Sequence, residues 1–446
     1  NRWRAKMLDK NFIFGVATSS YQIEGAHDKD GRTPSIWDTF SKIKGKTFNM
    51  DNGDVACDHY HRYKEDVELM KELGVDAYRL SISWPRIFPK EGEYNSKGME
   101  FYKNLLKELK EKGIKVAVTL YHWDLPQWVQ DKNRWEDRNN INYFLEYAKK
   151  CFIELDEYVD MWITHNEPWC ASFLSNALGE HAPGKRSITS AVKVAHHLLL
   201  SHGMTVRMYR ELGFKKPIGI TLNLSPYYPA TDEFKDLIAA NNGDGFLNRW
   251  FLEPIFKGHY PFDMINLYSQ RVEDFSFIKK GDFSIIGEKC DFLGINFYNR
   301  IVVEYDPTNV LMLRPAFTDY KKTSMGWDVS PNEFIDLIRM VRNKYTDLPI
   351  YITENGAAFE DYVENGKVHD IDRVIYIEDH IKAIEKMNEE KLNVAGYFCW
   401  SLLDNFEWAH GYSKRFGIVY VDFNTQERIK KDSFYKYKEI IKKYKE

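Results

Sequence analysis

Short apolar runs recur along the whole chain and alternate with longer stretches whose apolar residues are spaced three or four apart. Each run is rich in β-branched residues and bounded by polar ones, which is typical of a strand buried on both faces. The pattern predicts strands over residues 12–18, 77–83, 116–121, 161–165, 218–223, 292–297, 350–354 and 396–401.

The stretches between the runs carry apolar stripes at helical spacing, and several of these stripes end at a glycine. The clearest stripes cover residues 60–73, 101–109, 141–152, 188–212 and 371–392. Strand–helix alternation predicts a parallel sheet, and eight such units favour a (β/α)8 TIM barrel over an open sheet. No proline- or glycine-rich linker divides the chain. We therefore predict a single α/β domain over residues 1–446, in which 227–283 and 302–323 are insertions or extended loops.

The composition narrows the class of function. Lys and Arg number 62 against 66 Asp and Glu, a formal charge of -4, which argues against the basic face that a nucleic-acid partner needs. No run of 18 apolar residues occurs, so no membrane span is expected. Aromatic residues make up 15% of the chain, and such rings either fill a core or stack on the apolar faces of sugars and bases.

The cysteines and the first residues indicate the cellular compartment of the protein. Five cysteines, an odd number, lie far apart in the sequence. This predicts free thiols in a reducing, cytoplasmic compartment rather than disulfides or a zinc site. The first residues lack the apolar run of a signal peptide, and residues 1–6 are interpreted as an addition before a native start at Met7.

Polar and aromatic side chains gather directly after the predicted strands, where the reactive groups of a TIM barrel lie. Two of them are glutamates, Glu167 and Glu354, each at the end of a different strand. Paired carboxylates suit acetal cleavage, because one gives a proton to the departing oxygen while the other attacks or stabilises the anomeric carbon. The residues alone leave two questions open: whether both glutamates are merely surface or ion-pair residues, and whether such a pair would retain or invert configuration.

Six motifs stand in one order along the chain, at residues 17–25 (ATSSYQIEG), 78–86 (YRLSISWPR), 121–126 (YHWDLP), 164–168 (THNEP), 351–356 (YITENG) and 400–408 (WSLLDNFEW). In these motifs the chain resembles family 1 glycoside hydrolases, the β-glucosidase family, over nearly its whole length. The resemblance implies a TIM barrel whose active site lies at the C-terminal ends of the strands. It also implies that Glu167 is the general acid/base, that Glu354 is the nucleophile, and that Arg79 and Tyr298 hydrogen-bond Glu354.

The resemblance further implies a sugar pocket. Asn166 would bind the 2-hydroxyl, Trp400 would lie under the sugar ring, Trp327 would line the leaving-group side, and Glu407 would sit as an anion beside the 4- and 6-hydroxyls and repel a 6-phosphate. The full set of substrate-binding residues it implies is Gln22, His122, Trp123, Asn166, Asn296, Trp327, Trp400, Glu407, Trp408 and Phe416.

The function implied is that of a retaining, exo-acting β-glycosidase. It would release terminal β-D-glucosyl residues from cello-oligosaccharides and from aryl or alkyl β-glucosides, with a side activity on β-galactosides and β-fucosides. The expected partner is a small β-glycoside, with no cofactor or metal; an oligomer is left open. Three alternatives are weighed: a non-catalytic sugar sensor, which need not keep both glutamates; a phospho-glycosidase, disfavoured by Glu407; and a thioglucosidase, disfavoured by Glu167.

Several positions depart from the family pattern. Phe14 stands where Trp is common, residues 131–135 lack the two glycines usual before Trp135, and His165 replaces Leu or Phe. Strand alternation predicts that His165 packs on the face opposite to Asn166. His196, His197 and His202 share a helix but have no companion carboxylate at metal-binding spacing, so a metal site is not expected.

Overall fold

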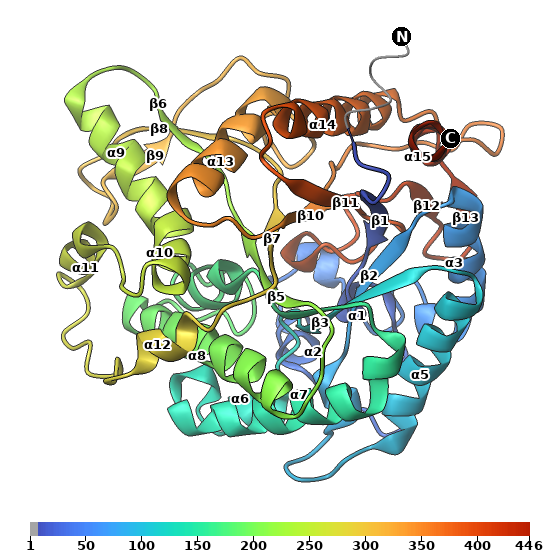
Figure 1. Ribbon diagram of the computed structural model, residues 1–446, viewed down its shortest axis with the longest axis horizontal. Helices are drawn as coiled ribbons and strands as arrows, with labels where there is room; N and C mark the ends of the chain where they lie inside the picture. Colours follow the sequence, from blue (N-terminus) through green and yellow to red (C-terminus); the bar gives the residue numbers. More distant parts are fainter. Residues whose placement is uncertain (1–7) are drawn as a thin grey trace.

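The computed structural model describes residues 8–446 and joins all eight predicted strands into one closed parallel barrel (Figure 1). Each strand pairs in parallel with its neighbours, and the last pairs with the first, with Ala17 opposite Trp400. The predicted (β/α)8 barrel is therefore confirmed. The interpretation of residues 1–6 lies outside the described residues. The barrel strands are β1 (Ile13–Ala17), β2 (Ala77–Ser81), β3 (Lys115–Tyr121), β4 (Met161–Asn166), β5 (Ile218–Asn223), β7 (Phe292–Asn296), β10 (Ile350–Asn355) and β11 (Val394–Trp400).

Strand alternation divides the core into two parts. Side chains that point into the barrel, such as Ala77, Ile163 and Phe398, form a small inner cluster. Their neighbours in sequence, such as Tyr78, point outward and join the large apolar layer between the strands and the helices. Arg79 lies on the inner face of β2 with Ala77, so a guanidinium reaches into the barrel.

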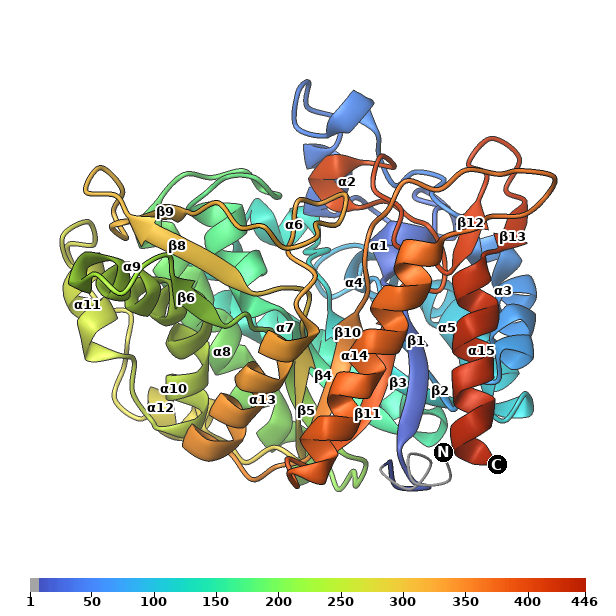
Figure 2. The same ribbon diagram turned by 90° about the horizontal axis from the view of Figure 1, so that it is seen from above.

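Helices surround the barrel on all sides (Figures 1 and 2). The longer helices are α3 (His59–Leu73), α5 (Ser96–Glu111), α7 (Ile141–Leu155), α8 (Ile188–Glu211), α13 (Pro331–Lys344), α14 (Ile371–Glu389) and α15 (Asp432–Lys445). The five predicted apolar stripes correspond to α3, α5, α7, α8 and α14, and α3 ends where Gly74 adopts a left-handed φ of 83°. The shorter ones are α1 (Ser20–Ile23), α2 (Ile36–Phe40), α4 (Trp84–Ile87), α6 (Gln127–Gln130), α10 (Trp250–Phe256), α11 (Phe262–Tyr268) and α12 (Asp282–Ile286).

The two segments predicted as insertions or extended loops contain secondary structure of their own. β6 (Tyr227–Pro229), β8 (Ile301–Tyr305) and β9 (Leu313–Pro315) form a separate three-stranded sheet, against which α9 (Phe234–Asp244) packs. Figure 2 shows this unit beside the barrel, at the upper left. A second small sheet pairs β12 (Val419–Val421) with β13 (Arg428–Lys430).

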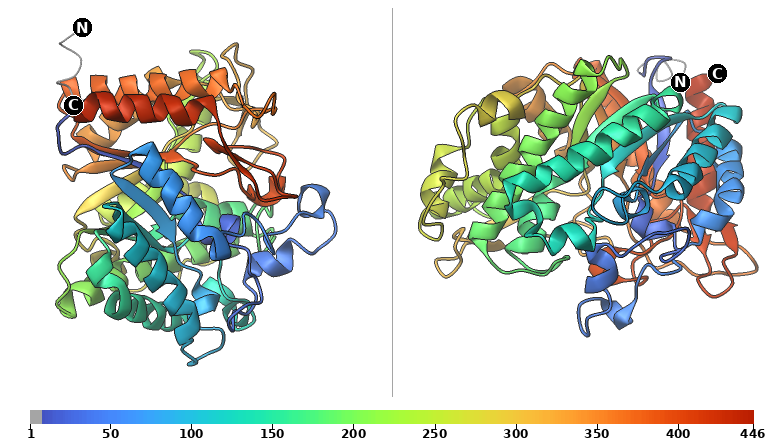
Figure 3. Two further views of the ribbon diagram at one scale, coloured as in Figure 1. Left: turned by 90° about the vertical axis from the view of Figure 1, so that its right-hand side faces the viewer. Right: turned by 90° about the horizontal axis from the view of Figure 1, so that it is seen from below.

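The two ends of the barrel differ. At one end, the start of β1 lies beside the end of α15, where Lys445 Nζ donates a hydrogen bond to the Phe12 carbonyl at 2.8 Å. At the other end, the loops that follow the strands gather, and the segment containing α2 projects from the molecule (Figures 2 and 3). Across residues 8–446 no helix combines the length and apolarity that a membrane crossing requires. All five cysteines are buried and free.

Candidate active site

A cavity of about 410 Å³ opens among the loops at the C-terminal ends of the strands. Arg79 and Asn166 lie directly behind its wall, where they hydrogen-bond to residues that line it. The other predicted site residues all line the cavity itself: Gln22, His122, Trp123, Glu167, Asn296, Tyr298, Trp327, Glu354, Trp400, Glu407, Trp408 and Phe416.

Glu354 lies near the end of β10 and is held at both carboxylate oxygens. Arg79 Nη1 donates to its Oε2 at 2.7 Å, and the Tyr298 hydroxyl donates to its Oε1 at 2.6 Å. Gly356, two residues later, lets the chain turn close to β11, since a Cβ there would come within 1.7 Å of the Trp400 carbonyl oxygen. Glu354 is therefore fixed in place beside a permanent positive charge.

Glu167 follows β4 directly and adopts a left-handed φ of 50°, a conformation that costs a non-glycine residue about 1–3 kcal/mol and is concentrated at functional sites. Its amide donates to the Thr221 carbonyl on β5 at 2.9 Å. Asn296 Nδ2 donates to its Oε2 at 2.8 Å, and the Cys170 thiol donates to its Oε1 at 3.2 Å. Its carboxyl thus has neutral partners only.

A polar network joins the two glutamates through the barrel. Asn166 Oδ1 accepts from Arg79 Nη2 at 2.7 Å and from Asn296 Nδ2 at 3.0 Å. Thr353 Oγ1 donates to Asn296 Oδ1 at 2.7 Å, and so fixes which end of that amide faces Glu167. The two carboxyl groups are therefore oriented by shared partners that come from four different strands, β2, β4, β7 and β10.

The surroundings of the two carboxyls separate their charge states. Burial, followed by the charge of Glu354, raises the pKa of Glu167 to about 8. Burial also raises the pKa of Glu354, but the guanidinium of Arg79 and the Tyr298 hydroxyl oppose this rise. Since Arg79 contacts only one of the pair, the first negative charge settles on Glu354, and Glu167 keeps its proton at neutral pH.

Glu407 is the third buried carboxyl of the cavity. Gln22 Nε2 lies 3.5 Å from its Oε2, and the same amide donates to the Phe406 carbonyl at 2.9 Å. Burial, with Glu354 and Glu167 nearby, raises the pKa of Glu407 to about 8. The sequence analysis expects an anion at this position. The raised pKa favours the protonated form of Glu407 at neutral pH, because no cation accompanies the carboxyl.

Aromatic rings form much of the remaining wall. The Trp123 and Trp408 ring centroids lie 4.6 Å apart, and His122 stacks on Trp400 at 6.1 Å. The Tyr298 and Trp327 ring centroids lie 5.4 Å apart. A pocket that combines flat apolar rings with carboxyl and amide groups suits a ligand with many hydroxyls and apolar faces.

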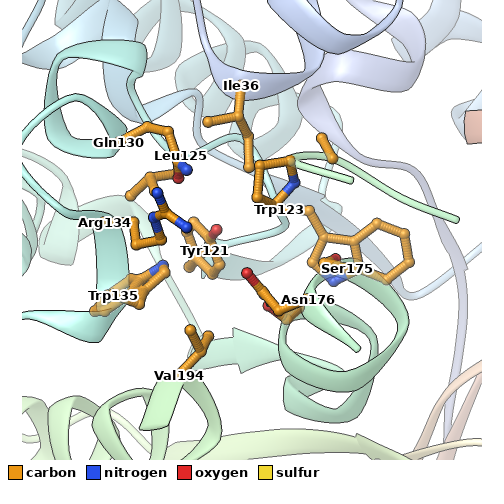
Figure 4. Close-up of a pocket in the computed structure, with 13 residues that line it drawn as sticks. Ile36, Tyr121, Trp123, Leu125, Gln130, Arg134, Trp135, Ser175, Asn176 and Val194 are labelled. Carbon is orange, nitrogen blue, oxygen red and sulfur yellow. The ribbon is translucent and has the colours of Figure 1, made fainter. Parts of the chain in front are cut away.

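A second, much smaller cavity of about 10 Å³ also has Trp123 in its wall, so this ring separates it from the larger cavity (Figure 4). Arg134 and Trp135 line the smaller cavity, in the segment that lacks the usual pair of glycines. Asn133 and Arg134 adopt φ values of 71° and 52°, the left-handed region that glycine favours. The departure in sequence therefore leaves the glycine-type backbone in place.

Residues 4–446 match the model of glycosyl hydrolase family 1. The chain belongs to this family. The resemblance stated from the six motifs is thereby confirmed, and the protein is an enzyme, a glycosyl hydrolase.

Relatives of this family 1 chain cover it almost completely. The structure of a family 1 β-glucosidase from Exiguobacterium antarcticum B7 superposes with a TM-score of 0.98 at 58% identity, covering 98% of this chain and 99% of that one. β-Glucosidase A of Acetivibrio thermocellus is 46% identical over 97% of this chain and 98% of its own length. A bifunctional β-D-glucosidase/β-D-fucosidase of Bifidobacterium breve is 41% identical over 98% of each chain.

The sequence analysis of this family 1 enzyme missed some cavity residues. The sequence analysis identifies Cys170 only as a free thiol. Its position three residues after Glu167 is the signal that could predict a contact between the two side chains, since residues three apart on a helical turn are neighbours. Trp169, Glu180, His181, Asn223 and Tyr227 also line the cavity. Asn223 ends β5 and Tyr227 begins β6, whereas Glu180 and His181 lie in a loop whose course no periodic pattern predicts.

The histidines singled out in the sequence of the enzyme lie outside the cavity. His165 Nε2 contacts Ser201 Oγ on α8 at 2.7 Å, on the side of β4 away from the barrel interior. His196 lies between Tyr260 and Asp282, and His202 Nδ1 contacts Thr164 Oγ1 at 2.6 Å. Within residues 8–446, no three His, Cys, Asp or Glu side chains are grouped as metal ligands.

These buried histidines predict a loss of stability in acid. Burial lowers the pKa of His202 to about 3, whereas an unfolded histidine titrates near 6.5. The unfolded chain therefore binds a proton below pH 6.5 that the folded chain refuses until about pH 3, so stability falls as pH drops through this window. Between pH 7.5 and 5.5 His202 should cost about 1 kcal/mol.

Urea unfolding of the His202→Gln variant checks this expectation. The variant is less stable at every pH because its contact with Thr164 changes, but its stability should fall less between pH 7.5 and 5.5, by about 1 kcal/mol. Thr164→Val, which removes the same contact but keeps His202, is the matched control and should keep the slope of the wild type. Equal slopes for His202→Gln and the wild type would contradict the assignment.

Proposed function

We propose that this family 1 enzyme is a retaining, exo-acting β-glucosidase. It releases terminal β-D-glucosyl residues from cello-oligosaccharides and from aryl or alkyl β-glucosides, and also acts on β-galactosides and β-fucosides. The main support for this proposal is that two buried glutamates line one cavity. The guanidinium of Arg79 binds Glu354, whereas Glu167 has only neutral hydrogen-bond partners. The names of the relatives, β-glucosidases and one β-glucosidase/β-fucosidase, support the substrate class.

In the first step, Glu354 Oε attacks the anomeric carbon while Glu167 gives its proton to the glycosidic oxygen. The C–O bond to the leaving group breaks, the alcohol departs, and a glucosyl ester of Glu354 remains. Arg79 and Tyr298 hold the nucleophile ionised and aimed. Burial keeps Glu167 protonated for this task.

In the second step, esterification has removed the negative charge of Glu354, so the pKa of Glu167 falls and the group becomes a base. It takes a proton from water, whose oxygen attacks the anomeric carbon and releases Glu354. Two displacements retain the configuration. In retaining enzymes the two catalytic carboxyl groups lie about 5–5.5 Å apart. The Asn296 amide interacts with both Glu167 and Glu354, which supports such a short separation in this enzyme.

The pocket residues bind the sugar by hydroxyl recognition and stacking. The Asn166 amide already donates to His122 Nε2 at 3.1 Å and has a second N–H for the 2-hydroxyl. Gln22, His122 and Glu407 face the other hydroxyls, and Trp400 supports the ring. Trp123, Asn296, Trp327, Trp408 and Phe416 complete the wall on the sugar and leaving-group sides.

The cavity favours neutral sugars. Among the described residues that line it are four glutamates and no lysine or arginine. A 6-phosphate would find no cation in this wall and would be repelled by ionised Glu354 and, above its pKa of about 8, by Glu407, which costs several kcal/mol. We expect kcat/KM for a 6-phosphoglucoside to lie at least about 10³-fold below that for the glucoside, with a smaller gap in Glu407→Gln at pH values above about 8, where Glu407 is ionised. Comparable rates on both substrates would contradict this.

Hydrolysis of a panel of aryl β-glycosides and cello-oligosaccharides tests the function, with the first-formed anomer followed by NMR. β-Glucose as the first product supports retention, and α-glucose would overturn it. Tight binding of glucosides without turnover would revive the alternative of a sugar sensor. The prediction of one catalytic domain, the cytoplasmic location and the absence of a cofactor remain predictions.

A further inference from the structure

The two oxygens of the Glu167 carboxyl have different partners. Oε2 accepts from the Asn296 amide at 2.8 Å, and Oε1 lies 3.2 Å from the sulfur of Cys170. Across residues 8–446, this thiol is the sole hydrogen-bond partner of Oε1. Cys170 begins the π-helical turn Cys170–Leu174, and its carbonyl accepts from Ser175 Oγ at 2.7 Å, so the backbone that carries the thiol is fixed.

The two partners determine which carboxyl oxygen of neutral Glu167 carries the proton. An amide N–H only donates, so the oxygen it contacts must be the unprotonated one, and the proton of neutral Glu167 resides on Oε1. That proton faces a sulfur, which accepts and donates weakly. We propose that Cys170 is a positioning residue that holds Oε1 of Glu167 in both protonation states, accepting from the carboxylic acid and donating to the carboxylate.

The weakness of the thiol suits the two steps of the reaction. Because sulfur is a weak acceptor, the Oε1 proton is easily released from it to the glycosidic oxygen of a bound substrate. A hydroxyl in its place would bind the carboxylate more strongly and make Glu167 a poorer base and a less protonated acid. This inference rests on the acid/base role proposed for Glu167.

A nucleophilic or redox role for Cys170 is disfavoured by its surroundings. Burial and the neighbouring Glu167 raise the pKa of the thiol well above its usual range, so the reactive thiolate is suppressed. The groups that can influence Glu167 in a pH profile are Glu354 and Arg79 across the barrel, Tyr298, Glu407 and Cys170 itself.

The test compares pH profiles of kcat/KM for the wild type, Cys170→Ser and Cys170→Ala. The basic limb that belongs to Glu167 is identified first, as the one lost in Glu167→Gln. The stronger serine donor stabilises the carboxylate and moves this limb to lower pH, and alanine moves it to higher pH. On the alkaline side the Ala variant should exceed the Ser variant by about three- to tenfold, relative to their plateau rates.

Cys290→Ser is the matched control, because Cys290 has the same 6% exposure but lies just before β7, at the opposite end of the barrel. Its limb should coincide with that of the wild type. Coincident limbs for all Cys170 variants, or the reverse order of Ser and Ala, would overturn the proposal. If the Ala variant does not fold, judged by its thermal melt, the Ser variant alone decides. A wild type without β-glucosidase activity would instead refute the proposed function.

Discussion

Replacing Glu354 by alanine is expected to lower kcat on aryl β-glucosides by at least about 10⁴-fold, because no other group can form the glucosyl ester. The surrounding network explains why no substitute exists. Arg79 and Tyr298 aim one carboxylate at the cavity, while Glu167 is held away from that cation by Asn296. Initial-rate assays with a chromogenic glucoside measure the loss.

The chemistry of the loss can be distinguished from misfolding. The alanine variant leaves a space beside the guanidinium of Arg79 that admits a small anion such as azide. Azide attacking from that side displaces the aglycone once, so an activated β-glucoside should yield the α-glucosyl azide, detectable by NMR. Glu360→Ala, at an exposed glutamate in the loop that follows β10, should retain full activity. A Glu354→Ala variant with activity above about 10% would contradict the nucleophile assignment.

The barrel itself follows from local pattern. Strands such as β3 are apolar on both faces. A parallel barrel buries both faces, because helices cover its outside and side chains fill its inside. The alternation of these runs with amphipathic stripes then leaves few topologies. Sequence reasoning fails for β6, β8 and β9, because two of these strands have three residues and Val303 is the one buried residue among them, so no periodicity marks them.

The site was predictable in its members but not in its connections. Strand ends and the family resemblance name Glu167 and Glu354, whereas the amide of Asn296 reaches Glu167 across 129 residues of sequence. No local pattern records such a contact. The raised pKa of Glu407 could not be predicted for the same reason, since a pKa depends on burial and on distant neighbours that only the folded chain assembles.

Replacing Glu167 by glutamine is expected to lower kcat/KM strongly for substrates with poor leaving groups and only slightly for substrates with good ones. A poor leaving group, such as an alkyl alcohol or unsubstituted phenol, needs the proton of Glu167, and kcat/KM should fall about 10²- to 10⁴-fold. A 2,4-dinitrophenolate leaves without a proton, so its kcat/KM should stay within a few-fold of the wild type. Its kcat should fall nonetheless, since the glucosyl ester on Glu354 has lost the base that activates water.

The pH dependence of kcat/KM is a second test of the acid/base role of Glu167. With a pKa of about 8, Glu167 ionises in the free wild-type enzyme as the pH rises past this value, and kcat/KM for poor leaving groups should decline. Glu407 titrates in the same range, so only the part of the decline that Glu167→Gln abolishes belongs to the acid. Glu157→Gln, an exposed glutamate before the start of β4, should match the wild type in both readouts. Equal losses on good and poor leaving groups would assign Glu167 to binding rather than to proton transfer, because a residue that only orients the sugar serves both substrates alike.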